Sequence, residues 1–238
     1  MPDIEQHLAA VRARIATAEK LAGRPPGCVA LVAVSKTASA AAIRTSAQAG
    51  QRAFGESYIQ EALGKIDALS DLNLEWHFIG PIQSNKTRPI AEHFGWVHSV
   101  DRLKTAQRLN EQRTPSQPAL NVCIQVNVSH ESSKSGVPPA DSIPLARAML
   151  ALPRLRLRGL MTIPRATDDV NEQRASFRLL AQLRHDIEVS LGISLDTLSM
   201  GMSSDLESAI VEGATAVRVG TDIFGARTAA NARIDSKG

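Results

Sequence analysis

The stretch VALVAVSKT, residues 29–37, decides the fold of this chain of 238 residues. Its first six residues are all apolar, so the stretch has no polar face, which is typical of a parallel strand that is buried on both sides. The run passes directly into Ser35-Lys36-Thr37. We therefore expect a first strand of a parallel α/β fold with a lysine at its carboxyl end.

Seven further short apolar or β-branched runs follow, and segments with helical patterns separate them. The expected strands are residues 29–36, 52–55, 75–80, 96–100, 121–128, 157–163, 197–200 and 216–220. Such alternation predicts either a closed (β/α)₈ TIM-type barrel or a doubly wound open sheet. The number of strands and the length of the chain favour the barrel. No GxGxxG turn follows the first strand, as it would in a Rossmann sheet.

An extra helix is expected ahead of the barrel, over about residues 2–22. Ile4, Leu8 and Val11 begin an apolar stripe that recurs every three or four residues, and Gly23 ends the pattern. The expected single domain covers residues 1–238: this helix, a barrel over about residues 28–227, and a short C-terminal tail.

Two later helices have recognisable start signals. Asp101 is placed to cap a helix that runs toward Arg113. Ser204-Asp205-Leu206-Glu207 has the spacing of a capping box just after the seventh strand. That second helix is expected to direct its positive end toward the carboxyl end of the barrel.

Charge and composition exclude several classes of protein. The net charge is only +3, and the arginines of the densest basic stretch, residues 154–158, alternate with leucines rather than aromatic residues. We expect an exposed strand face there and no nucleic-acid partner. Cys28 and Cys123 lie far apart, which argues against zinc and for free thiols in a reducing compartment. The acidic start is unlike a signal peptide, and no apolar run approaches the length of a membrane span. A cytoplasmic protein without a membrane partner is expected.

Lys36 is the first candidate for chemistry. A lysine that follows a buried strand is partly removed from water, which disfavours the ammonium and leaves more neutral amine to attack an aldehyde. The alternative is a lysine that extends its head into solvent, and from this strand alone that outcome is the commoner one.

The seventh and eighth strands end in small and hydroxyl-bearing residues, LSMGMS at 198–203 and RVGT at 218–221. Barrels often bind phosphate after these two strands, where small residues expose backbone N–H groups. Gly201 and Gly220 permit close approach of the backbone, and Ser199 and Thr221 add hydroxyl groups. Glycines that merely form tight turns are the alternative.

An amine beside a phosphate site indicates a phosphorylated aldehyde, and pyridoxal 5′-phosphate (PLP) is the obvious cofactor. In a closed barrel the first strand neighbours the eighth, so one PLP could link Lys36 to the phosphate site. Arg218 is then expected beneath the pyridine nitrogen. Because arginine stays protonated, it would keep that nitrogen as an unprotonated acceptor and weaken carbanion chemistry. The alternative is an Arg218 that pairs with a carboxylate inside the barrel.

The chain also resembles a known family in several blocks. They are AVSKT (33–37), FGE (54–56), WHFIGPIQSNK (76–86), SKSG (133–136), LRGLM (157–161), LSMGMS (198–203), RVGT (218–221) and IFGAR (223–227). In these blocks it resembles the pyridoxal phosphate homeostasis proteins, over roughly residues 29–227, and its barrel is similar to the N-terminal half of alanine racemase. The resemblance implies a Schiff base on Lys36. The phosphate contacts that it implies are Ser199, Gly201, Met202, Gly220 and Thr221.

Some positions differ from that family or remain open. Ser57 stands where asparagine is usual, Ala38 where a second lysine is common, and His130 where aspartate is frequent. These differences argue against a second lysine near Lys36 that would bind PLP transiently. The further residues expected to line the pocket are His77, Asn127 and Met161. For His77, a core histidine with satisfied hydrogen bonds is an equal alternative.

The preferred function is a carrier that holds PLP as a lysine aldimine and takes part in vitamin B6 and amino-acid homeostasis, with PLP-dependent apo-enzymes as recipients. Barrel-type PLP racemases and decarboxylases carry a second, β-rich domain, whereas only Thr228–Gly238 follow the expected barrel here. We therefore expect no established catalytic turnover. A small PLP-dependent racemase or lyase is the first alternative, and a lysine aldolase or sugar-phosphate barrel without PLP is the second.

Overall fold

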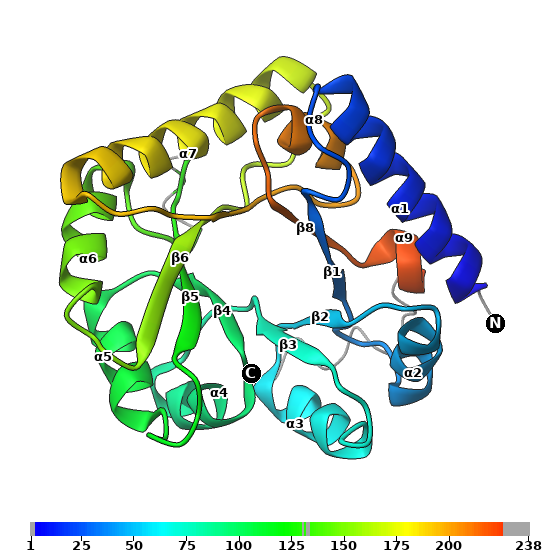
Figure 1. The fold of residues 1–238 in the computed structure, drawn as a ribbon, viewed down its shortest axis with the longest axis horizontal. Helices are drawn as coiled ribbons and strands as arrows, with labels where there is room; N and C mark the ends of the chain where they lie inside the picture. Colours follow the sequence, from blue (N-terminus) through cyan, green and yellow to red (C-terminus); the bar gives the residue numbers. More distant parts are fainter. Residues whose placement is uncertain (1–2, 130, 132–133, 226–238) are drawn as a thin grey trace.

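The computed structural model describes residues 3–129, 131 and 134–225, which form a closed barrel of eight parallel strands (Figure 1). The strands are β1 (Ala30–Val34), β2 (Ala53–Glu56), β3 (Glu75–Phe78), β4 (Trp96–Val100), β5 (Leu120–Gln125), β6 (Leu155–Met161), β7 (Thr197–Ser199) and β8 (Ala216–Val219). Each strand pairs with the next in sequence, and β1 closes the ring against β8. The predicted (β/α)₈ barrel is confirmed, and each expected strand is present with small differences at its ends.

Helices surround the barrel. They are α1 (Ile4–Leu21), α2 (Ala40–Gln48), α3 (Ile59–Ala68), α4 (Thr87–His93), α5 (Leu103–Gln112), α6 (Ser142–Met149), α7 (Val170–Leu191), α8 (Leu206–Val211) and α9 (Thr221–Phe224). None of the helices in the described ranges is long and apolar enough to cross a membrane. The predicted tail after residue 227 lies outside the described residues.

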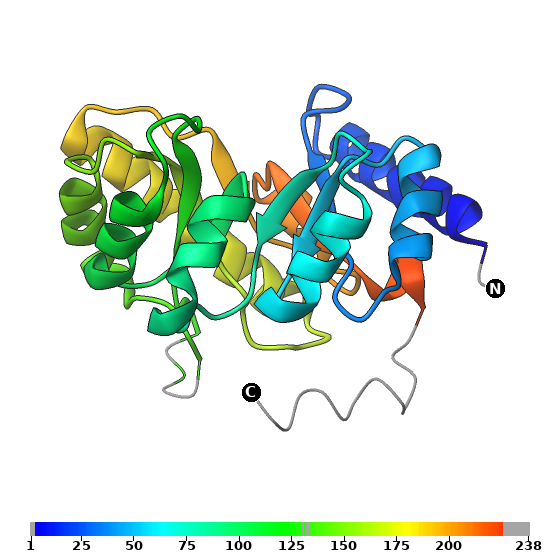
Figure 2. The ribbon, with the colours of Figure 1, turned by 90° about the horizontal axis from the view of Figure 1, so that it is seen from below.

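The extra N-terminal helix is present as α1. It lies on the outside of the barrel against α2, α8 and α9 (Figure 1, Figure 2). Its predicted apolar stripe, Ile4, Leu8 and Val11, is buried there, and the side chain of Asp3 caps the first turn by accepting from the Gln6 N–H at 3.1 Å. This helix therefore covers the seam where β8 meets β1 and the helices that follow β7 and β8.

Both predicted capping signals are wrong. α5 begins at Leu103 after Arg102, and the carboxylate of Asp101 contacts the Arg102 side chain instead of a helix N–H. α8 begins only at Leu206, so Ser204 is too early to cap it. The Asp205 carboxylate turns back and accepts the Met202 N–H at 2.6 Å. Each aspartate carboxylate accepts from a donor outside the helix, Asp101 from the Arg102 side chain and Asp205 from the Met202 N–H. The spacing of residues in the sequence does not reveal such donors.

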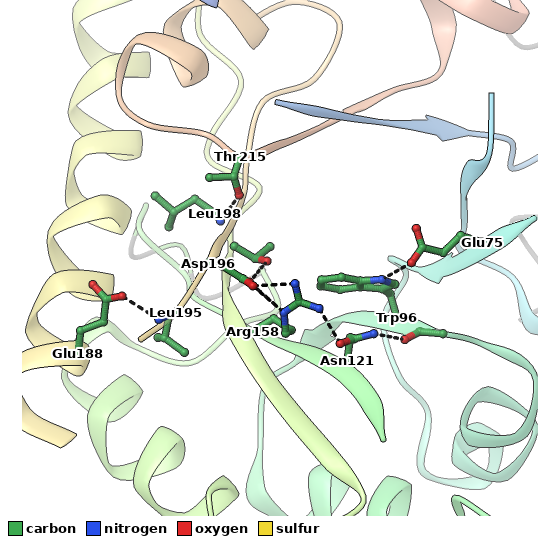
Figure 3. Close-up of polar contacts among 11 residues, drawn as sticks. Glu75, Trp96, Asn121, Arg158, Glu188, Leu195, Asp196, Leu198 and Thr215 are labelled. Carbon is green, nitrogen blue, oxygen red and sulfur yellow. Dashed lines mark hydrogen bonds and ion pairs between the residues drawn. The ribbon is translucent and has the colours of Figure 1, made fainter. Parts of the chain in front are cut away.

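A polar cluster closes the amino-terminal end of the barrel (Figure 3). The guanidinium of Arg158 lies 4.6 Å from the centre of the Trp96 ring and donates to Asp196 at 2.7 Å and to Asn121 at 2.8 Å. The indole N–H of Trp96 donates to Glu75 at 2.6 Å. Arg158 thus lies across the amino-terminal end of the barrel rather than on an exposed strand face. The register between β5 and β6 shifts beside it, between Val122 and Cys123.

Candidate functional site

A pocket of about 820 Å³ opens at the carboxyl end of the barrel. Its walls come from the segments that follow β1, β2, β3, β6, β7 and β8, and from parts of α1, α2 and α9. Five residues predicted from the sequence line it together: Lys36, Met202, Arg218, Gly220 and Thr221. They meet because β1 pairs directly with β8, which puts the ends of these two strands side by side.

The two predicted glycines have different surroundings. Gly201 has a left-handed backbone with φ of 95°, and an added Cβ would lie only 2.6 Å from the Cβ of Ala209. This glycine therefore lets α8 pack against the loop, and it does not line the pocket. Gly220 directly precedes α9 at the pocket wall, where an added Cβ would lie 3.0 Å from the Val34 carbonyl oxygen. A short helix after the eighth strand is a frequent part of phosphate sites in barrels.

The structure places the other predicted residues away from the pocket lining. Ser199 and Met161 are fully buried in the barrel. Asn127 lies in the loop after β5 and donates to the Glu131 carbonyl at 2.8 Å. His77 points into the barrel interior, where its Nδ1 lies 2.9 Å from His98 Nε2. The reading of His77 as a core histidine therefore fits its surroundings better.

Arg218 is a buried cation that forms no ion pair with any described residue, although Asp205 attracts it at longer range. Its side chain is 3% exposed, and it donates to the Ser199 hydroxyl at 2.7 Å and to the Thr162 carbonyl at 2.8 Å. No carboxylate of the described residues lies within ion-pair distance of it, so the alternative of a carboxylate pair inside the barrel does not hold. Burial lowers the pKa of Arg218 to about 10, which still leaves it charged at neutral pH.

Lys36 lies two residues beyond β1 and is half-buried in the pocket wall. The next residue, Thr37, has a φ of 68°, the one positive φ of a non-glycine residue in the described ranges. Its backbone N–H donates to the Glu61 carboxylate at 2.7 Å. A strained backbone next to a functional side chain persists only when its surroundings fix it, and Glu61 does so here.

A buried ion cluster holds the backbone on the amino-terminal side of Lys36. The ammonium of Lys65 donates to the Ser35 carbonyl at 2.7 Å and contacts the carboxylates of Glu56 at 2.9 Å and Glu61 at 2.5 Å. The Ser35 hydroxyl also donates to Glu56 at 2.6 Å. Burial raises the pKa of Glu56, although Lys65 and Ser35 oppose the change. This cluster was not foreseen from the sequence, where only the i,i+4 spacing of Glu61 and Lys65 hints at it.

The helix α1 is tied to the loops that form the pocket. Arg14 donates to Glu207 of α8 at 2.7 Å, to Asp222 of α9 at 2.6 Å and to the Ser203 carbonyl at 2.9 Å. Ser203 and its neighbour Ser204 line the pocket, although the sequence did not single them out as contacts. Their position directly after the predicted glycine loop was the available signal.

The site can therefore do two things chemically. A primary amine from Lys36 and a buried guanidinium from Arg218 face one cavity, with hydroxyl groups and a short helix start beside them. An amine can bond covalently to a carbonyl group, and a buried cation is a strong donor to a lone pair or an anion.

Comparisons with known proteins indicate one family. The family model described as alanine racemase, N-terminal domain, matches residues 6–228. The pyridoxal phosphate homeostasis protein of Pseudomonas aeruginosa is 62% identical over 95% of this chain and 97% of its own length. The protein of that name from Escherichia coli strain K12 is 50% identical over 95% and 98%. The structure of PipY from Synechococcus elongatus PCC7942 with PLP bound superposes with a TM-score of 0.83 and 38% identity, over 94% of this chain and all of that one.

Proposed function

Because the chain belongs to the pyridoxal phosphate homeostasis proteins, within the family of alanine racemase N-terminal domains, we propose that it binds PLP at Lys36 and acts in vitamin B6 and amino-acid homeostasis. The observation that carries the proposal is that Lys36 and Arg218, from neighbouring strands, line one pocket.

The residues present fit PLP. A buried guanidinium with no carboxylate in direct contact is costly unless a ligand uses its charge, and Arg218 is such a group within the described structure. The backbone at Gly220 comes so close to Val34 that a side chain there would crowd the pocket wall. Gly220, Thr221 and Ser203 are the residues that we expect beside the phosphate.

When bound, PLP supplies an aldehyde that condenses with a primary amine and releases water. Lys36 would provide that amine, on a backbone held by Glu61 and Lys65. Arg218 would donate a hydrogen bond to the pyridine nitrogen and, as a permanent cation, would not let that nitrogen take a proton. A ring in that state withdraws electrons weakly, which suits storage and delivery of PLP better than turnover of amino acids.

We further propose that PLP-dependent apo-enzymes receive the cofactor, and that this happens in the cytoplasm. Lys36 is only half-buried, so an incoming amine can approach it from solvent. Both cysteines are free thiols, as expected in a reducing compartment.

The test is to load the purified protein with PLP, reduce it with borohydride and map the pyridoxyl group by peptide mass spectrometry. We expect one adduct, on Lys36, and no absorbance band at the edge of the visible range for Lys36→Ala. Lys104→Ala, which changes an exposed lysine of α5, should keep both signals. An adduct spread over several lysines, or a band that survives in Lys36→Ala, would contradict the proposal.

Incubation of the loaded protein with amino acids in deuterated water distinguishes a carrier from an enzyme. We expect the α-protons to remain. Their loss at enzymatic rates would make the protein a racemase or lyase instead.

A further inference from the structure

A chain of hydrogen-bonding side chains runs through the barrel interior and ends at the pocket. Arg218 donates to the Ser199 hydroxyl at 2.7 Å, and that hydroxyl lies 2.7 Å from Nδ1 of His98. Nε2 of His98 lies 2.9 Å from Nδ1 of His77, and Nε2 of His77 lies 3.3 Å from the Glu75 carboxylate. The first four residues are at most 5% exposed.

The chain joins the two ends of the barrel. Glu75 is the first residue of β3, at the amino-terminal end, and its side chain is 52% exposed. Arg218 comes near the end of β8 and lines the pocket. The strands β4 and β7 do not pair with each other, so His98 and Ser199 meet only across the interior.

The two ends determine the direction of each hydrogen bond between them. Arg218 can only donate, and a carboxylate at Glu75 can only accept. Burial and the positive charge of Arg218 hold the pKa of His98 well below its usual value, so its ring is neutral, with one donor and one acceptor nitrogen.

With one hydrogen on each ring, one arrangement satisfies all the groups. The Ser199 hydroxyl donates to His98 Nδ1, His98 Nε2 donates to His77 Nδ1, and His77 Nε2 carries a hydrogen toward Glu75. The reverse order would set a lone pair of His77 against the carboxylate. His77 Nε2 makes no hydrogen bond of good geometry within the described residues, and the Glu75 carboxylate at 3.3 Å is the acceptor that lies within its reach. The contact with His77 lowers the pKa of Glu75.

Such an order has an electrostatic consequence for Arg218. Each group in the chain presents its negative end toward the guanidinium, so the dipoles add, and a carboxylate lies at the far end. The ordered side chains thereby add to the longer-range attraction of Asp205 in stabilising this buried cation. A carboxylate in direct contact would instead neutralise the effect of Arg218 on a ligand.

We propose that Ser199, His98 and His77 are positioning residues that fix Arg218 through this ordered chain to Glu75, and so set how strongly Arg218 acts on the ring nitrogen of PLP. The second half of this statement rests on the proposed function. The first half concerns the protein alone.

The test of the first half is the tautomeric state of the histidines in the PLP-free protein, measured by long-range ¹H–¹⁵N NMR at neutral pH. We expect the hydrogen of His98 on Nε2, and a bare Nδ1 on both His77 and His98. A hydrogen on Nδ1 of either ring would overturn the ordered chain whether or not the protein binds PLP.

The second half is tested by substitutions that interrupt the row of hydrogen-bonded side chains at each of its two ends. Ser199→Ala removes the link beside Arg218, and Glu75→Gln removes the charge at the far end. For Ser199→Ala we expect a displaced absorbance band of bound PLP and an affinity about tenfold weaker. Glu75→Gln should displace the band in the same direction by less.

Asp71→Asn, which changes an exposed ion pair outside the barrel, is the control and should match the unchanged protein. If Ser199→Ala and Glu75→Gln bind PLP on Lys36 with the unchanged spectrum, these side chains only fill the barrel and the proposal is wrong. Loss of the Lys36 adduct from the unchanged protein would instead contradict the proposed function.

Discussion

The ammonium of Lys65 lies 2.7 Å from the carbonyl oxygen of Ser35, the residue immediately before Lys36. The same ammonium neutralises Glu56, which is fully buried, and Glu61 holds the strained Thr37 on the other side. The position of Lys36 is therefore fixed by a buried ion cluster on β2 and α3 as well as by its own strand. Several expected outcomes follow from contacts of this kind.

Lys65→Met should destabilise the protein by about 3–5 kcal/mol, because it leaves a buried carboxylate at Glu56 without its partner. It should also slow covalent capture of PLP, because the Ser35 carbonyl loses its donor and Glu61, which holds Thr37, loses its ion pair. Urea unfolding and the rate at which the visible band appears measure the two effects.

Arg44→Ala is the matched control for Lys65→Met. It breaks an ion pair with Asp71 that is exposed on both sides, so neither the unfolding midpoint nor the rate should change. Equal behaviour of the two variants would show that burial of the Lys65 cluster has no special effect.

Asp196→Asn should make the protein less stable in a pH-dependent way. Burial raises the pKa of Asp196, but hydrogen bonds from Arg158 and Thr197 outweigh it and bring the pKa below the usual 3.8. Since the folded pKa is the lower one, the stability from this carboxylate is present above pH 3.8 and is lost as the pH falls through the folded pKa.

The measurement for Asp196→Asn is urea unfolding at several pH values. Because the carboxylate is 54% exposed, we expect a deficit of about 1 kcal/mol at pH 6 that disappears in strong acid. A deficit of the same size at every pH would mean that packing, and not the charge of the Asp196 carboxylate, accounts for it.

Gly201→Ala should cost about 2–4 kcal/mol, because the new methyl group combines a left-handed backbone with a close contact to Ala209. Gly23→Ala separates the two causes, since Gly23 has a φ of 66° and no atom within 4 Å of an added Cβ. We expect about 1 kcal/mol for that variant by thermal or urea unfolding. Equal losses would show that crowding at α8 contributes nothing.

Arg14→Ala should loosen the pocket without unfolding the barrel. It releases α8, α9 and the Ser203 carbonyl from α1, so residues 203–222 should exchange amide hydrogens faster and PLP affinity should fall several-fold. Because Arg14 is 36% exposed, the loss of overall stability should be only about 1 kcal/mol.

The control for Arg14 lies two residues earlier on the same helix. Arg12 donates to Ala49 and Gln51 after α2 and forms no hydrogen bond or ion pair with the loops after β7 and β8 in the described structure. Arg12→Ala should leave exchange in residues 203–222 unchanged. Faster exchange there in both variants would mean that α1 acts on the pocket through its general packing.

The barrel and the position of Lys36 could be predicted because local pattern determines them. A run of apolar residues such as Val29–Val34 is buried on both faces wherever it lies, so strand identity follows from neighbouring residues alone. Parallel closure then places Lys36 and Gly220 in one pocket, because the first and last strands must pair. That Lys36 captures PLP remains a prediction.

Side chains whose partners lie far away in the sequence could not be assigned in this way. Asp205 matches a capping pattern but satisfies the Met202 N–H, because a loop donor comes closer than the helix. Ser199 was expected at phosphate, yet it bonds to Arg218 and His98 beneath the pocket. His98 gave no sequence signal at all.

The sequence by itself determined which segments are strands, their order around the barrel and which end carries the amine, since each follows from hydrophobic pattern and parallel pairing. Only the tertiary structure decided which polar groups meet in the interior, how Arg218 is held and what fixes the backbone around Lys36. Those contacts depend on barrel closure and strand register, which bring side chains from non-adjacent strands within hydrogen-bond distance.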